Sequence, residues 1–339
     1  MTRRRSWAPE SQRRRLRAAV VGAGLMGRWH ADAVRRAGAT VAAVIDPAAD
    51  RAASLASIHG ATVSDSLTPV LGTVDVVHLC TPTPSHEDLA AQAIDAGRHT
   101  LVEKPLASTA AATRALLARA AARQVLLCPV HQFPWQPGAQ RLAETLPALG
   151  AVRHVDVTIC SAGAALPGAA DADTIAIEIL PHPLSLLSRL FPPALEASWM
   201  VQRPACGELR LTSEAAGATV SILISMSGRP PVNALRIVAE RGTAYLNLFH
   251  GFVVIERGGT SRRAKIAQPL ALSARTMGAA TANLLRRVTR REPAYPGLRA
   301  FVAEFYRAAS EGGPPPVPEG EAVAIAEIMD LVRRLVLGA

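Results

Sequence analysis

The chain has 339 residues, 49% of them hydrophobic and 19% charged, and this length suits two domains better than one. The formal net charge of +10 at pH 7 would suit a nucleic-acid partner, but much of the excess lies in residues 1–17 and in LLRRVTRREP. Residues 1–16 have no apolar repeat and no apolar core of a secretory signal, so we interpret them as a disordered basic leader. We expect no nucleic-acid partner; salt-dependent binding through this leader is the alternative.

A strand, a tight glycine turn and a helix are predicted by RAAVVGAGLMGRWH. The apolar run at residues 18–21 is short and does not alternate, which is typical of a buried parallel strand. Three glycines follow with GxGxxG spacing: the first permits the turn, the second lets the backbone approach a pyrophosphate, and the third lets the helix pack closely. The first N–H groups of the helix would face the phosphates. The predicted pyrophosphate site is Gly22, Gly24, Leu25, Met26 and Gly27.

An acidic residue, Asp46, ends the second predicted strand, TVAAVID. A carboxylate at this point can accept hydrogen bonds from the adenosine ribose and would repel the extra phosphate of NADP. Pro47 and Ala48 follow, without an adjacent Arg or Lys to hold such a phosphate. We therefore predict NAD as the cofactor in preference to NADP. The alternative is that Asp46 only caps the next helix.

The same pattern recurs in VDVVHLCTPTPSHEDLA, which predicts a buried strand at residues 74–80 and a helix from about Ser85, capped by Ser85 or Thr83. Two further strands follow, one of them ending at EKP. Strands that alternate with helices predict a doubly wound parallel sheet, whose ligands bind at the carboxyl ends of the strands. Asp46, Thr81 and Lys104 all follow such ends.

After about Phe133 the strands partly alternate and are separated by turn residues. This predicts a second, α+β domain with an open, mostly antiparallel sheet and helices on one face. We place a Rossmann domain over residues 17–132 and the second domain over residues 133–339, whose last helix could pack back on the first domain.

The four cysteines form no CxxC pair and no cluster with zinc-ligand spacing. Cys80 and Cys128 lie in apolar, strand-like runs, where buried and inert thiols are typical. No apolar run reaches the roughly 18 residues that span a bilayer. We therefore predict a cytoplasmic protein without a metal site.

At Glu103-Lys104-Pro105 the chain comes to resemble a known family, the glucose–fructose oxidoreductase, inositol dehydrogenase and MocA-like oxidoreductases. The resemblance is carried by VVGAGLMGRWH, AVID, CTPTPSHEDLA, LVEKPLA, RIVAERGTAYLNL and the tail from FVAEFY onward. It implies that Lys104 lies beside the nicotinamide and the reacting hydroxyl. It also implies that Glu103 contacts the ribose or orients Lys104. By the same resemblance, Thr81 and Pro82 line the nicotinamide ribose and His86 lies near them, as part of the cofactor site.

The family also has an Asp-x-x-x-His pair in its second domain, and Glu178 and His182 stand in those positions. The resemblance implies that His182 is the acid or base and that Glu178 supports it, since a nearby carboxylate fixes a histidine tautomer. The prolines around His182 leave two helix starts open. A helix from near Glu178 would place both side chains on one face, whereas a helix from Pro183 would leave Glu178 outside.

Two regions depart from the family. Ser185 and Gln132 replace charged groups, so we expect a substrate less polar than a free polyol. The insertion at residues 268–298 predicts an amphipathic helix that packs on the sheet or a neighbouring subunit, with membrane-surface contact as the alternative.

Together these features predict an NAD(P)-dependent oxidoreductase that moves hydride between the nicotinamide and a carbinol carbon of a small sugar-like, cyclitol-like or secondary-metabolite substrate. An imine reductase, a redox-assisted elimination and a silent NAD-binding regulator are the alternatives. We expect a homodimer or homotetramer formed through the C-terminal sheet.

Overall fold

The computed structural model describes residues 15–162, 171–258 and 262–338. Contacts between Cα atoms divide the chain into two compact units. The first unit contains the chain up to Glu103 together with residues 118–128 and 302–315, and the second contains the remainder. The leader predicted over residues 1–16 lies almost wholly outside the described residues. The boundary that we place between residues 132 and 133 remains a prediction.

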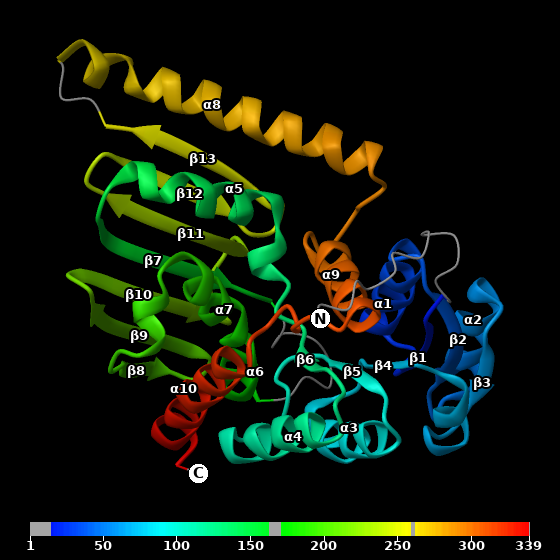
Figure 1. Cartoon of the computed structure of the whole chain (residues 1–339). Helices are drawn as coiled ribbons and strands as arrows, with labels where there is room; N and C mark the ends of the chain where they lie inside the picture. The colour runs from blue at the N-terminus through cyan, green and yellow to red at the C-terminus, as the bar shows by residue number, and fades with distance from the viewer. Residues whose placement is uncertain (1–14, 163–170, 259–261, 339) are drawn as a thin grey trace, which may run out of the picture. The chain divides into compact units, whose positions relative to one another are not determined.

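A six-stranded sheet with the order β3-β2-β1-β4-β5-β6 forms the centre of the first unit (Figure 1). The pairs from β3 to β5 are parallel, and β1 and β4 are almost wholly buried, as expected of a parallel sheet. The predicted doubly wound sheet is therefore confirmed. Its strands are β1 (Arg17–Val21), β2 (Thr40–Ile45), β3 (Thr62–Ser64), β4 (Val76–Leu79), β5 (His99–Val102) and β6 (Leu127–Pro129). The helices that alternate with these strands are α1 (Leu25–Arg36), α2 (Ala49–His59) and α3 (His86–Asp95) in the first unit, and α4 (Ala110–Ala122), which has residues in both units.

The helix after β4 begins one residue later than predicted, because a short 3₁₀ turn, Thr83–Ser85, precedes it. Ser85 occupies the cap position of α3 but makes no capping hydrogen bond through its side chain. Its hydroxyl instead donates to Thr81 Oγ1 at 2.8 Å. The side chain therefore stabilises the loop at the carboxyl end of β4.

The second unit contains a seven-stranded sheet with the order β13-β12-β11-β7-β10-β9-β8 (Figure 1). Every neighbouring pair is antiparallel except β7 with β10, so the predicted open, mostly antiparallel sheet is confirmed. The strands are β7 (Val152–Cys160), β8 (Met200–Ala205), β9 (Glu208–Ala215), β10 (Ala218–Ser225), β11 (Val232–Ala239), β12 (Gly242–Asn247) and β13 (Phe252–Arg257).

Alternating apolar side chains of this sheet face the helices and form the core of the second unit. Val157, Ile222 and Ile237 from the sheet belong to one buried cluster with Leu184 and Val332 from the helices. This core holds the helices that carry the candidate catalytic residues. The helices of the unit are α5 (Pro137–Thr145), α6 (Ala172–Ile179), α7 (Pro181–Leu190), α8 (Arg262–Thr289) and α10 (Glu319–Leu337), and α9 (Leu298–Glu311) has residues in both units.

The insertion predicted as a helix over residues 268–298 forms α8. This helix begins earlier than predicted, at Arg262, and also ends earlier, at Thr289. It runs beside β13 (Figure 1), where Asn283 Nδ2 donates to His250 O at 2.9 Å. Much of its apolar surface is exposed: 75% of Ile266, 78% of Leu270 and 69% of Met277. Among the described helices, none is long and apolar enough to cross a membrane.

Both predicted helix starts around His182 are wrong. One helix, α6, begins already at Ala172, with the Asp171 carboxylate accepting the N–H groups of Asp173 and Thr174. A second helix, α7, begins at Pro181 after a break at Leu180. Pro181 and Pro183 both lie in the first turn of α7, where no N–H donor is needed. Glu178 lies outside this helix, as the second alternative predicts.

Candidate functional site

The glycine turn of the first unit has the close backbone approaches that its spacing predicts. Gly22 has φ +94°, and a Cβ there would lie 2.5 Å from Cys80 O. A Cβ on Gly27 would lie 1.8 Å from Gly22 O, so only glycine permits this approach of α1 to the turn. At Gly24, by contrast, a Cβ would meet nothing within 4 Å. The turn therefore has open space where a pyrophosphate could approach the backbone, beside the start of α1 at Leu25 and Met26.

Asp46 lies at the carboxyl end of β2, beside this turn. Its carboxylate accepts the N–H groups of Ala23 and Ala48, each at 2.8 Å, and the Arg51 Nη2 donor at 3.0 Å. Burial alone would raise the pKa of Asp46, but these donors lower it below its usual value. Asp46 is therefore an anion held at the turn. The bond to Ala48 goes to the residue before α2 and not to an N–H group of the helix itself, so Asp46 does not cap α2.

The sequence motif does not reveal Arg51. Arg51 is not adjacent to Asp46 in the sequence, but the first turn of α2 brings its guanidinium back to the carboxylate. Its side chain is 59% exposed, so the guanidinium also reaches solvent. A basic residue in the first turn of the helix after an acidic strand end is the signal that could have identified it.

The loop after β4 places Thr81, Pro82 and His86 together. The His86 Nε2 donates to Thr81 O at 2.8 Å, and the ring is buried. Pro82 is exposed at the same loop. The structure thus brings the three predicted ribose residues together, with His86 bonded to the loop.

A buried chain of polar side chains reaches Glu103 from the core of the first unit. The His30 Nε2 lies 3.0 Å from Glu103 Oε1, and its Nδ1 lies 2.8 Å from His78 Nδ1. The His78 Nε2 lies 2.9 Å from the Tyr306 hydroxyl. Burial alone would lower the pKa of His30, but Cys80 and Glu103 raise it to about 10.

These contacts determine where the protons lie in the hydrogen-bonded row of Glu103, His30, His78 and Tyr306. Burial and the His30 charge hold the pKa of His78 well below its usual value, so His78 is neutral. A cationic His30 donates to Glu103 and to His78 Nδ1, and His78 then donates from Nε2 to Tyr306. Glu103 is therefore held as a carboxylate directly before Lys104. The sequence motifs do not assign His78 or Tyr306 to any site.

In the second unit, Lys104 and His182 lie near each other at the junction of α6 and α7. Lys104 Nζ donates to Glu178 O, the backbone carbonyl, at 3.1 Å. The His182 ring stacks on Phe133, with centroids 4.2 Å apart and planes 9° from parallel. Burial, Lys104 and His131 hold the pKa of His182 well below its usual value. The imidazole is therefore neutral and can accept a proton.

Glu178 is connected to Lys104 instead of to His182 Nδ1. That nitrogen is buried and has no hydrogen-bond partner. Glu178 lies in the last turn of α6 and His182 in the first turn of α7, so helical spacing does not pair them. The support of His182 by the Glu178 carboxylate remains a prediction, and His131 is a neighbour of His182 that the motifs did not reveal.

A cavity of about 630 Å³ lies within the second unit beside His182. Its wall combines apolar residues with amide, hydroxyl and imidazole groups, and none of the described residues that line it is acidic. Arg287 from α8 and the segment that follows this helix complete the wall. The insertion therefore contributes directly to the cavity.

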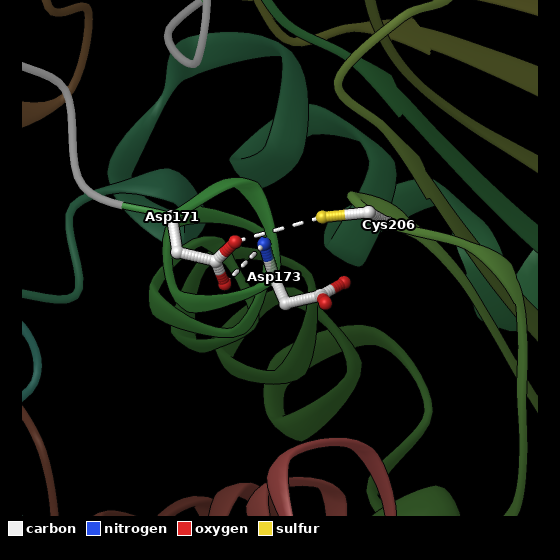
Figure 2. A group of neighbouring side chains, drawn as sticks. All are labelled: Asp171, Asp173 and Cys206. Atoms are coloured by element: carbon white, nitrogen blue, oxygen red, sulfur yellow. Dashed lines mark hydrogen bonds between the residues drawn. The ribbon is translucent and has the colours of Figure 1, made fainter.

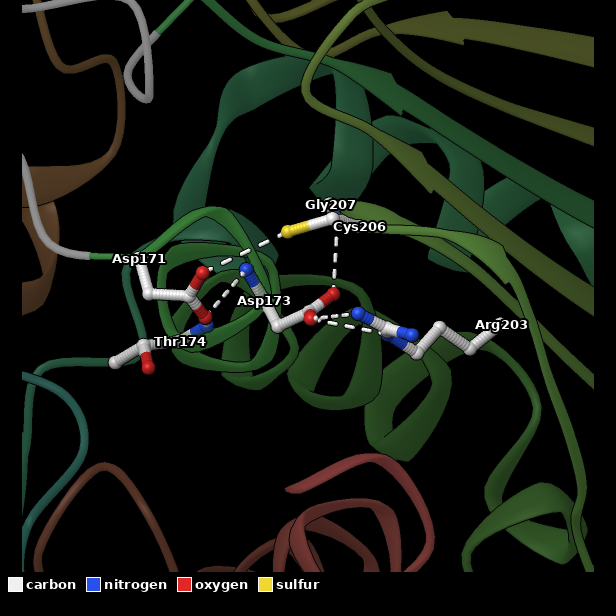
Figure 3. Close-up of polar contacts among 6 residues, drawn as sticks. All are labelled: Asp171, Asp173, Thr174, Arg203, Cys206 and Gly207. Atoms are coloured by element: carbon white, nitrogen blue, oxygen red, sulfur yellow. Dashed lines mark hydrogen bonds and ion pairs between the residues drawn. The ribbon is translucent and has the colours of Figure 1, made fainter.

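A group of two carboxylates and a thiol lies at the start of α6, formed by Asp171, Asp173 and Cys206 (Figure 2). Its ligand atoms lie within 4.8 Å of one another, which raises the question of a metal site. The carboxylates are already engaged, since Asp173 accepts from Arg203 Nη2 at 2.7 Å and Gly207 N at 2.7 Å (Figure 3). Asp171 caps α6. We assign the group to anchoring α6 against the turn between β8 and β9.

The glycine turn, the acidic end of β2 and the open parallel sheet define a dinucleotide-binding oxidoreductase domain. Residues 16–131 match the oxidoreductase family with an NAD-binding Rossmann fold, GFO_IDH_MocA. The resemblance that the motifs predict is confirmed over these residues.

Several relatives are similar over much of the chain. UDP-N-acetylglucosamine 3-dehydrogenase of Acidithiobacillus ferrooxidans is 29% identical over 225 residues, 66% of this chain and 68% of that protein. Inositol 2-dehydrogenase of Rhodococcus jostii is 29% identical over 255 residues, 70% of this chain and 69% of that protein. A solved structure of the Acidithiobacillus enzyme has a TM-score of 0.74 at 22% identity, covering 96% of this chain and 98% of that one. This last likeness concerns the fold of both units.

Proposed function

We propose that this protein is a nicotinamide-dependent dehydrogenase that moves hydride between C4 of the nicotinamide and a carbinol carbon of a sugar or cyclitol. The observation that carries the proposal is the neutral His182 with Lys104 nearby, beside a cavity large enough for a small molecule. Two similar relatives are named as dehydrogenases of a nucleotide sugar and of inositol, which supports this substrate class.

The residues of this chain fit the cofactor. The open space at Gly24 and the start of α1 would receive the pyrophosphate, and Asp46 would accept the adenosine ribose hydroxyls. When bound, NAD supplies the hydride acceptor. The space at Gly24 is the structural test of this fit, because a methyl group there would meet no protein atom.

Within the second unit, His182 would accept the proton of the substrate hydroxyl as the hydride leaves the carbon. The Lys104 ammonium would donate a hydrogen bond to the same oxygen and stabilise its developing negative charge. Phe133 fixes the plane of the imidazole, and Glu178 O holds the ammonium group. In the opposite direction, His182 would return the proton to the carbonyl oxygen as hydride reaches the carbon, and Lys104 would donate a hydrogen bond to that oxygen.

We also propose a preference for NAD over NADP, supported by the Asp46 anion at the turn. Replacing Asp46 by Ser should raise the ratio of kcat/KM for NADP to that for NAD by about tenfold or more, equivalent to about 1.4 kcal/mol. The reason is that the 2′-phosphate would no longer meet a carboxylate and could pair with the released Arg51 guanidinium. Adding Arg51→Ala should remove the gain for NADP. A double variant that keeps the full gain would show that Arg51 takes no part.

Turnover by the wild-type protein tests the proposed activity. With NAD and either UDP-N-acetylglucosamine, myo-inositol or scyllo-inositol, we expect NADH to form with at least one substrate and His182→Ala to abolish its formation. NAD binding without NADH formation from any sugar or cyclitol would instead favour the silent regulator. NADH-dependent reduction of an imine alone would favour the imine reductase.

The homodimer or homotetramer and the cytoplasmic location remain predictions. One feature supports the oligomer: the sheet face away from the helices carries Asp156, Arg210, Arg236 and Tyr245 around a hollow of about 450 Å³. Such a face could receive the same face of a second copy.

A further inference from the structure

The cavity beside His182 contains buried hydrogen-bond acceptors that lack partners. Gln132 and Gln136 are only 4% and 1% exposed, and the side-chain oxygens of both lack a hydrogen bond. Asn233 Oδ1, from β11, is a third buried acceptor without a partner. All three side chains line the cavity. Buried acceptors are normally satisfied, so we expect a ligand to bring hydrogen-bond donors to this wall.

The orientation of one amide is fixed by its surroundings. Gln136 Nε2 donates to Leu248 O at 3.0 Å, so its oxygen is the group left to accept. Gly251 also lies against this oxygen, since a Cβ there would be 3.5 Å from Oε1. Gln136 therefore presents an acceptor that cannot turn into a donor without losing an existing bond.

The charge of the cavity wall limits which donors can bind. Among the described lining residues, the permanently charged one is Arg287, and none is acidic. Its guanidinium is held by Glu292 O at 3.0 Å and by His250 Nδ1 at 3.1 Å, so the positive charge stays at the wall. Lys104 adds a second cation near His182. An ammonium group would enter this positive field without a carboxylate to pair with, whereas a hydroxyl would meet no such penalty.

The segment after α8 packs closely against the backbone of the residues that carry two of these amides, Gln132 and Gln136. A Cβ on Gly297 would lie 2.5 Å from Gln132 O and 2.9 Å from Gln136 N, and Gly297 has φ +94°. Tyr295, which lines the cavity, has φ +49°, a left-handed conformation that is uncommon for a tyrosine. Strained backbone of this kind is often kept at ligand sites. This segment lies within the insertion at residues 268–298, which departs from the family, so it is suited to set specificity.

We propose that the cavity selects a hydroxyl-rich sugar or cyclitol without an ammonium group, and that Gln132, Gln136 and Asn233 determine this selectivity. This replaces the expectation, drawn from the sequence, of a substrate less polar than a free polyol. The proposal rests on the proposed function, because it assigns the substrate class of the same cavity. The hydroxyl groups would donate to the three amide oxygens. An anionic group elsewhere on the substrate is compatible with Arg287.

Matched substrate pairs test this selectivity at a pH where the amines are protonated. The pairs are scyllo-inositol with scyllo-inosamine, and UDP-N-acetylglucosamine with UDP-glucosamine. We expect the wild-type protein to favour the member without an ammonium group in each accepted pair by about tenfold or more in kcat/KM, and in Kd measured with NADH present. Asn233→Asp keeps the shape and the acceptor but adds a negative charge, so the preference should fall by about tenfold or more.

Gln202→Glu is the matched control, because it adds the same charge on the exposed edge of β8. It should leave the preference unchanged. If Asn233→Asp does not fold, Gln136→Glu provides the second test. The proposed selectivity is overturned if the wild type uses the ammonium member equally well or better. It is also overturned if the preference is unchanged in a folded Asn233→Asp or Gln136→Glu variant. Neither result contradicts the proposed function. If NAD binds but no member of the two pairs binds or leads to NADH formation, the proposed function is contradicted as well.

Discussion

Lys104→Met should lower kcat by about a thousandfold or more while the affinity for NAD changes little, because the variant loses the donor to the reacting oxygen. The same variant should shift the titration of His182. Lys104 is one of the causes that hold the pKa of His182 below its usual value, so removing this cation should move the midpoint to higher pH. Stopped-flow or steady-state kinetics measure the first effect, and NMR titration of the His182 ring measures the second.

The chain offers a matched control in Lys265, which is exposed on α8. Lys265→Met removes the same charge and should leave both kcat and the His182 titration unchanged. A Lys104→Met protein with normal kcat would exclude Lys104 from the reaction. A normal His182 titration in that protein would show that the two groups do not interact in solution.

Two substitutions in the glycine turn should separate protein stability from NAD binding. Gly27→Ala should destabilise the first unit by about 3 kcal/mol or more, the upper end of ordinary overpacking, because the new carbon would lie 1.8 Å from Gly22 O. Gly24→Ala should leave the melting temperature unchanged, since a Cβ there meets nothing within 4 Å. It should nevertheless weaken NAD binding by about tenfold or more, because the methyl group occupies space needed by the pyrophosphate.

Thermal unfolding and calorimetric titration with NAD separate these effects. Gly72→Ala is the matched control, because its Cβ also meets nothing within 4 Å but lies outside the glycine turn. It should alter neither the stability nor the affinity. Unchanged NAD affinity in Gly24→Ala would contradict the placement of the pyrophosphate, and a fully stable Gly27→Ala would contradict the packing of α1.

The parts of the site that depend on local chain pattern could be predicted from the sequence. The glycine spacing predicts the close approach of Gly27 to Gly22, and the end of an apolar strand predicts the position of Asp46. Both are consequences of one strand, one turn and one helix. Lys104 could be assigned to the site only through the family resemblance.

The parts that depend on tertiary packing could not be predicted in this way. Arg51 reaches Asp46 through the first turn of α2, and the motif considers only adjacent residues. His131 and Phe133 meet His182 across 49 or more positions of sequence, so no spacing rule connects them. The start of α6 follows from the capping of its first turn by Asp171. The break at Leu180 follows from Pro181 and Pro183, which have no N–H groups to continue the hydrogen bonds of α6.

The hydrogen bond between His78 and Tyr306 has a consequence for the synthesis of the protein. The two residues are 228 positions apart, and residues 302–315 complete the first unit. At roughly 5–20 residues per second, a ribosome needs roughly ten to fifty seconds to make the intervening chain. During that interval the buried polar face of His78 lacks its partner, although the cofactor turn has already emerged. The nascent Rossmann unit must therefore wait for nearly the whole polypeptide before it can close, and a fragment that ends at residue 131 would lack this closing segment.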